Sequence, residues 1–215
     1  MRVSANLTQN GWFIDGLAAY TYSSNSETRN ITAGPFSGAA TGNFSGNAIN
    51  GSIDMGKQLY SSGINFSGTG GWTLIPMVSL GYTHADFNSF SETGAGAANL
   101  NVQSFSTDSF RTVLSTTFLY RIVASPNMAW TPGLTLGWRH EYLNDSQGIS
   151  SQLQGAGVGS FTINTESPSR DVAIIAPSLS VTIHKNISVF VDYELDMGSN
   201  KFHAQQVFAG MAIAF

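Results

Sequence analysis

The amino-acid sequence predicts an all-β protein, an antiparallel transmembrane β-barrel, and three observations lead to that prediction. Charged residues make up only 10% of the 215 residues, whereas ordinary soluble domains contain about 25%. Polarity comes instead from 28 Ser, 18 Thr, 16 Asn and 23 Gly, which are poor helix formers. Long segments also alternate between apolar and polar residues, as expected for strands with one apolar face.

Residues 129–143 show this alternation most clearly. Trp130, Leu134, Leu136 and Trp138 fall on one face, and small, polar or charged residues fall on the other. A bilayer-crossing strand needs about 9–11 residues, and only a closed sheet leaves no unpaired edge in lipid. The sequence therefore predicts eight full membrane-crossing strands, in 12–23, 49–60, 72–84, 109–122, 129–143, 172–183, 187–197 and 203–215.

The connections between these strands alternate in length. Short ones fall at 8–11, 61–71, 123–128 and 184–186, and long ones, rich in Gly, Ser, Asn and Thr, fall at 24–46, 86–108 and 144–170. Membrane barrels have short turns on one side and long loops on the other, so we expect the long segments to be loops. The short connection 198–201 on the long-loop side is the exception.

Three prolines lie inside predicted strands. Pro76, Pro132 and Pro177 all fall in the apolar set. Because proline cannot donate a ladder hydrogen bond, we expect a lost bond at each of them, at a β-bulge.

Aromatic and charged residues divide between the two faces. Aromatic residues on the apolar face are predicted to form girdles at the two membrane interfaces: Trp12, Tyr22, Trp72, Tyr82, Trp130, Trp138, Tyr142 and Tyr193. Lys57 is the one cation in the apolar set, near a strand end from which it can snorkel to the interface.

The charges on the opposite face are predicted to face the lumen: Asp15, Asp54, Arg111, Arg121, Arg139, Glu141, Asp192, Glu194 and Asp196. Two interpretations stay open for them. They line a lumen that passes or holds an extended segment, or they form Arg–carboxylate pairs that stiffen the wall.

Other functional classes find little support. Nine scattered basic residues give no footprint for nucleic acid, and the absence of Cys removes thiolate chemistry. The four His have no metal-ligand spacing, so no metal or cofactor is expected. The closest approach to a catalytic set is His84 and Asp86 with Asp108 and Ser109. Because serine is so abundant, we expect no enzyme and keep a barrel-rim hydrolase as the third alternative.

The last residues carry a recognisable pattern. Gly210, Met211, Ile213 and Phe215 resemble the C-terminal assembly signal of bacterial outer-membrane barrels, which the barrel-assembly machinery reads. In that signal the position two before the glycine is usually polar, and here Phe208 occupies it.

An ordered set of motifs carries a wider resemblance. It includes 11–16 (GWFIDG), 75–82 (IPMVSLGY), 90–95 (FSETGA), 108–114 (DSFRTVL), 132–142 (PGLTLGWRHEY), 192–195 (DYEL), 198–200 (GSN) and 210–215 (GMAIAF). In order and spacing these resemble the C-terminal translocator β-barrel domain of type V secretion autotransporters, over essentially the whole chain. That family barrel has twelve strands, and residues 1–215 would supply the last eight, with 3–7 as the tail of the preceding one.

The resemblance implies a barrel in the outer membrane of a Gram-negative bacterium that anchors and permits export of an attached passenger domain. Its implied partners are outer-membrane lipid, the barrel-assembly machinery and the passenger itself, which this chain does not include. The start of the sequence has no apolar signal segment, so an N-terminally truncated barrel is expected. The alternative is a stand-alone small barrel with a structural or adhesive role through its extracellular loops.

Overall fold

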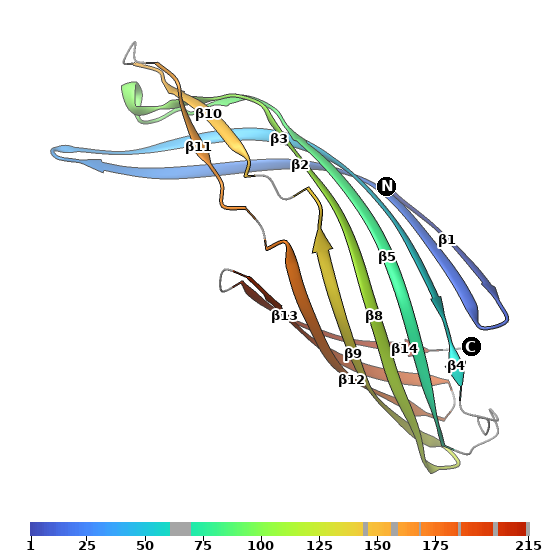
Figure 1. Ribbon diagram of the computed structural model, residues 1–215. Coiled ribbons are helices and arrows are strands. Elements are labelled where there is room, and N and C mark those ends of the chain that lie inside the picture. The colour runs from blue at the N-terminus through green and yellow to red at the C-terminus, as the bar shows by residue number, and fades with distance from the viewer. Residues whose placement is uncertain are drawn as a thin grey trace.

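The computed structural model describes residues 1–60, 70–143, 146–155, 159–167, 169–184, 186–199 and 202–213. These residues form two antiparallel sheets, of which the larger curls into an open trough (Figure 1). The order of the larger sheet is β1 (Arg2–Gln9), β2 (Trp12–Ala33), β3 (Phe36–Lys57), β5 (Gly71–Phe87), β8 (Phe105–Ser125), β9 (Met128–Glu141), β12 (Asp171–Ile183), β13 (Ile187–Gly198) and β14 (His203–Ile213), with the short β4 (Leu59–Tyr60) paired to β5. Its strands follow one another in chain order. Two-residue turns join β1 to β2, β2 to β3 and β8 to β9, whereas residues 88–104 and 142–170, which carry the smaller sheet, separate β5 from β8 and β9 from β12.

The predicted all-β antiparallel class is confirmed, although the strand count differs slightly. Residues 3–7 were expected to be the tail of a strand. The structure instead has β1, which pairs with β2 along its whole length, from Arg2 opposite Ala19 to Gln9 opposite Trp12. Nine strands therefore follow one another along the larger sheet.

The expected loop 24–46 is instead the outer half of a long hairpin. Strands β2 and β3 are 22 residues each and stay paired in one register from Trp12 opposite Lys57 to Ala33 opposite Phe36. The turn is Gly34–Pro35, where Gly34 has a φ of 58° that glycine adopts without strain. The Ser, Asn and Gly content suggested a loop because composition does not reveal a cross-strand ladder.

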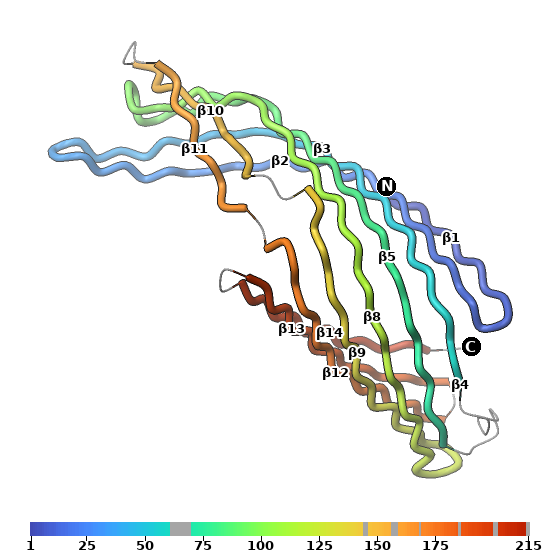
Figure 2. The backbone as a smooth tube through the Cα atoms, in the orientation of Figure 1, coloured from blue at the N-terminus to red at the C-terminus, as the bar shows by residue number. Residues whose placement is uncertain are grey.

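The other two expected loops contribute the smaller sheet. Residues 86–108 contain β6 (Phe90–Ser91), the 3-10 helix η1 (Gly96–Ala98) and β7 (Leu100–Val102), and residues 144–170 contain β10 (Gly148–Leu153) and β11 (Phe161–Asn164). Their order is β11-β10-β7-β6. The tube view shows β10 and β11 beyond the end of β9, near the outer part of the β2–β3 hairpin (Figure 2).

The three strand prolines each interrupt one ladder. Around Pro177, the β12–β13 pairs stop at Ile175 opposite Leu195 and resume at Ser178 opposite Asp192, while the pairing of β12 with β9 continues. Ladder hydrogen bonds are missing here, as expected. The register is the same on both sides of the gap, so the expected bulge is not present at Pro177. Equivalent gaps lie beside Pro132 in β8–β9 and beside Pro76 in β3–β5, and the register shift of β8 lies between Val123 and Ser125.

The larger sheet is inside-out compared with a soluble protein. In β9 the exposed residues Trp130, Leu134, Leu136 and Trp138 alternate with less exposed Thr, Gly and Arg residues. Among the described residues, the buried apolar ones are few: Ala40, Ala95, Ala129 and Val172. Exposed apolar side chains on one face and a polar opposite face are what lipid outside and water inside require.

Candidate functional site

The polar face of the larger sheet is the candidate site, and we call it the inner wall. It is the crowded side of the curved sheet. A Cβ on Gly137 would lie 3.3 Å from Ser115 Cβ and 3.4 Å from Ile174 Cβ, on the two flanking strands. Strand alternation places all nine predicted lumen charges on this face, in β2, β3, β8, β9 and β13.

One ion pair crosses the inner wall. Arg139 Nη1 on β9 lies 3.0 Å from Asp196 Oδ2 on β13, so the pair bridges the intervening strand β12. Asp196 is only 3% exposed, and its Oδ1 has no hydrogen-bond partner within the described part of the chain. Because a buried carboxylate is costly without a cation, Arg139 holds β9 and β13 at a fixed separation across β12.

A row of polar side chains crosses the opposite end of the sheet. Asp15 and Asp54 are directly opposite each other in the β2–β3 ladder. The amide of Asn6 donates to Asp15 and the hydroxyl of Ser79 donates to Asp54, which extends the row over β1, β2, β3 and β5. The row presents carboxylates to the inner surface without a cation in the row.

The remaining predicted lumen charges have different surroundings. Glu141 accepts from the Ser109 hydroxyl at 2.6 Å and from the backbone amide of Phe110 at 2.9 Å, near the end of β9. Arg111 and Arg121 are exposed, and Asp192 and Glu194 are half-buried. Arg139 and Asp196 therefore fit the interpretation in which ion pairs stiffen the wall. The row that contains Asp15 and Asp54, which we call the acidic row, fits the interpretation of a polar lumen lining.

Aromatic rings occupy the space above glycines on the inner wall. A Cβ on Gly210 of β14 would be 2.5 Å from Cζ of Phe190, and a Cβ on Gly56 of β3 would be 2.4 Å from Cζ of Phe13. Any larger side chain would displace these rings, since the nearest approach is far below contact distance. Of the predicted assembly signal, Gly210 thus accommodates a ring, Met211 and Ile213 are exposed on the outer face, and Phe215 lies outside the described residues.

Seven of the predicted girdle residues are more than one-third exposed on the outer face. Trp72 pairs with Tyr120 near the short turns, and Tyr82 pairs with Phe110 ten residues further along β5. Ten residues at about 3.3 Å each and a tilt near 40° span about 25 Å, the height of the apolar band of a membrane barrel. The seven are Trp12, Tyr22, Trp72, Tyr82, Trp130, Trp138 and Tyr142, whereas Tyr193 is half-buried on β13 opposite Val207.

The residues considered for hydrolysis do not assemble into a catalytic triad. Both ring nitrogens of His84 contact carboxylates, Nδ1 with Asp108 and Nε2 with Asp86, each at 2.9 Å. Ser109 lies on the inner face and donates to Glu141, so no ring nitrogen is directed at its hydroxyl. Among the described residues, no group of three His, Asp or Glu is arranged to hold a metal ion.

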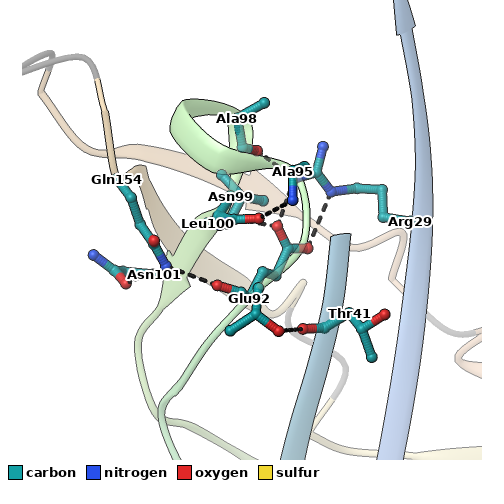
Figure 3. A network of polar contacts seen from close by, with 10 residues as sticks. Arg29, Thr41, Glu92, Ala95, Ala98, Asn99, Leu100, Asn101 and Gln154 are labelled. Carbon is teal, nitrogen blue, oxygen red and sulfur yellow. Dashed lines mark hydrogen bonds and ion pairs between the residues drawn. The ribbon is translucent and has the colours of Figure 1, made fainter. Parts of the chain in front are cut away.

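The smaller sheet docks on the β2–β3 hairpin through an ion pair that the residue pattern did not predict. Arg29 Nη2 lies 2.5 Å from Glu92 Oε2, and Arg29 Nε donates to Glu92 Oε1 at 3.1 Å. Figure 3 shows Arg29 and Glu92 among the backbone groups of the segment that includes Ala98 and Leu100, and these groups add bonds of 2.9 Å and 2.7 Å. The one sign of this ion pair in the sequence is an Arg and a Glu in two segments with few charges. Because the two residues are 63 positions apart, the sequence alone does not show that they pair.

The electrostatics of this junction are coupled. The hydrogen bonds from Arg29 lower the pKa of Glu92, and the same carboxylate raises the pKa of Arg29. Beside it, Phe44 of β3 stacks on Phe90 of β6 with ring centroids 4.7 Å apart, and Thr41 exchanges backbone hydrogen bonds with Thr93. Charge, ring stacking and a β-bridge together fix the smaller sheet to the hairpin.

The long strands with one apolar face and one polar face are those of a membrane β-barrel sheet. A family model of the autotransporter beta-domain matches residues 2–194, and the chain belongs to this family. The protein is therefore an outer-membrane β-barrel component of type V secretion in Gram-negative bacteria, a family of transport barrels. No curated protein matches the chain. Within the described residues, none of the helical structure is long and apolar enough to cross a membrane.

Proposed function

We propose that this chain anchors a passenger in the outer membrane and provides the wall along which that passenger is exported to the cell surface. The inner wall is the observation that carries the proposal. It offers hydroxyls, amides and carboxylates across its width, whereas most of the exposed large apolar side chains lie on the other face. A polypeptide in transit has unpaired backbone groups that must find hydrogen-bond partners, and a wall of this chemistry provides them.

The distribution of charge favours passage over tight binding. The acidic row of Asp15 and Asp54 is contacted by neutral Asn6 and Ser79, so it can accept from a passing chain without a competing cation in the row. Arg139 is already engaged by Asp196. The wall therefore gives many weak polar contacts, which are replaced one by one as the chain advances.

The test uses the fact that the chain has no Cys. Ser52→Cys and Ile53→Cys are adjacent substitutions on β3. The first side chain lies on the inner wall and the second on the outer face. A passenger carrying one Cys, stalled during export, should cross-link through a short bifunctional maleimide to position 52 and not to position 53. Equal cross-linking at both, or none at position 52, would contradict passage along the inner wall.

We also infer that residues 1–215 are the C-terminal part of a barrel that further strands complete. Strands β1 and β14 end the strand order of the larger sheet, and an unpaired edge in lipid is costly. The alternative is direct pairing of β1 with β14. Paired Cys substitutions at Ala5 and Ala209 would form a disulfide on oxidation if the two edges joined directly, and we expect none.

One further partner and a second candidate function belong to this proposal. The barrel-assembly machinery is expected to recognise the β14 region, where Gly210, Met211 and Ile213 precede Phe215. A second candidate function, adhesion, is favoured by the smaller sheet, because its docking at Arg29 and Glu92 fixes a folded surface beyond the aromatic belt. Cells that express the barrel without a passenger would adhere only if the second function holds.

A further inference from the structure

The outer face of the larger sheet is hollowed along one oblique row. The hollow has a volume of about 780 Å³ and is lined mostly by apolar surface. Trp12 borders it at one end and Trp138 at the other, while Pro76 and Thr116 lie between them. We call this feature the outer groove.

Side-chain size explains the outer groove. Pro76 and Thr116 are opposite each other in the β5–β8 ladder, and Thr116 is opposite Leu136 in the β8–β9 ladder. Both Pro76 and Thr116 are short, so the surface drops between the large rings at the two ends. The row from β2 to β9 crosses four inter-strand steps of about 4.8 Å, or roughly 19 Å.

The rings at the two ends are held in place by polar contacts. The Nε1 of Trp138 donates to Asp171 at 3.0 Å. The Nζ of Lys57 lies 5.0 Å from the centroid of the Trp12 ring, at a distance that permits a cation–π interaction. A groove with fixed ends presents a defined shape rather than a surface that adapts to any neighbour.

Lys57 supplies the charge at one end of the groove. It pairs with Trp12, which follows the short turn at Asn10 and Gly11, and short turns of outer-membrane barrels lie on the periplasmic side. It is the cation among the lining residues of the groove. A positive group at the periplasmic interface, next to an apolar groove that continues into the membrane, matches an anionic headgroup joined to an acyl chain.

We propose that the outer groove binds one diacyl phospholipid from the periplasmic leaflet, with the lipid phosphate at Lys57 and an acyl chain over Pro76 and Thr116. Lys57 is thereby a lipid-recognition residue rather than a cation that merely snorkels away from the apolar face. The site depends on the membrane location of the sheet and not on passenger export, so the two proposals can fail separately.

The experiment is native mass spectrometry of the protein extracted from outer membranes in mild detergent and titrated with dioleoyl phosphatidylglycerol. We expect one retained phospholipid per chain. Lys57→Gln should weaken its binding about fivefold, the effect of one basic residue at a lipid surface. Arg170→Gln, which removes one positive charge from the connection that precedes β12, is the matched control and should bind as the wild type does.

A second pair of variants tests the shape of the groove. Thr116→Phe fills the groove and should abolish retention, whereas Ala209→Phe adds the same ring on the outer face of β14, away from the groove, and should not. Both place an apolar ring toward lipid, and insertion of each is checked by its migration before and after heating. Retention by Thr116→Phe at the wild-type level, retention of lipopolysaccharide in place of phospholipid, or no retained lipid on the wild type would overturn the proposal.

Discussion

The membrane part of the larger sheet and the junction with the smaller sheet are stabilised in opposite ways. In the membrane part, large apolar side chains are exposed and neighbouring strands are held by their ladders. At the junction, the buried residues include Glu92, Asn99 and Ala95, beside an ion pair and stacked rings. The difference has a physical cause. Lipid covers the apolar face within the bilayer, whereas the junction lies beyond the bilayer and must exclude water by its own packing.

The largest effect is expected from breaking the inner-wall ion pair. Arg139→Ala leaves Asp196, which is 3% exposed, as a buried charge without its cation, at a cost of about 3–5 kcal/mol. Urea unfolding of the barrel in lipid vesicles measures this loss. Arg111→Ala, which removes an exposed arginine from the same face, is the control, and an equal loss for both would show that Asp196 does not need Arg139.

The next largest effect is expected from a charge on the outer face. Leu114→Arg places a guanidinium toward lipid and should cost about 2–4 kcal/mol near the midplane. Ser115→Arg, the adjacent residue on the inner wall, should cost far less, since its side chain enters the polar interior. Folding into vesicles compares the two, and equal yields would reject the assignment of the faces.

A smaller effect is expected at the junction. Glu92→Gln removes the charge that pairs with Arg29 and should destabilise docking of the smaller sheet by about 1–3 kcal/mol. Because the membrane ladders do not involve this pair, the unfolding midpoint of the larger sheet should stay unchanged. Proteolysis of intact cells should therefore cut within 86–108 faster in the variant, with Glu166→Gln, an exposed acid that follows β11, as control.

The smallest effect is a pH dependence of the same junction. The pKa of Glu92 is lowered in the folded state by Arg29, so its contribution is complete above the unfolded pKa of about 4.3. It is lost as pH falls through the lower folded value, and docking should loosen in acid below about pH 4. Proteolysis followed from pH 7 to pH 3 tests this, and Glu92→Gln should flatten the response.

The sequence predicted the membrane part well and the junction poorly, for a physical reason. Alternation along β9 or β12 is a local property, so the faces, the strand pattern and the family resemblance could be read directly from the residues. The contact of Arg29 with Glu92 joins two segments that are far apart in the chain. Neither segment has the alternating apolar residues from which a strand could be predicted. The ladder beside Gly34 and the small strands of 86–108 and 144–170 were missed for that reason.

The pairing of side chains on the inner wall could not be predicted from the sequence either. Alternation predicted that Arg139 and Asp196 share a face, but only the register shows that they meet across β12. The three prolines were expected at bulges, because a lost donor is most simply relieved by an extra residue. The structure keeps the register and leaves a gap in one ladder beside each of them instead.

The most direct test of the account is a Cys scan along β9, from Thr131 to Leu136, in the chain that has no Cys of its own. Each variant is exposed in outer membranes to a small water-soluble maleimide that passes through the barrel interior. We expect labelling at Thr131 and Thr135 and protection at Pro132, Leu134 and Leu136. Gly133 is left unchanged, because a Cβ there would lie 2.4 Å from Ser178 Oγ. Uniform labelling, or the reverse alternation, would contradict a sheet with lipid on its apolar face and water on its inner wall.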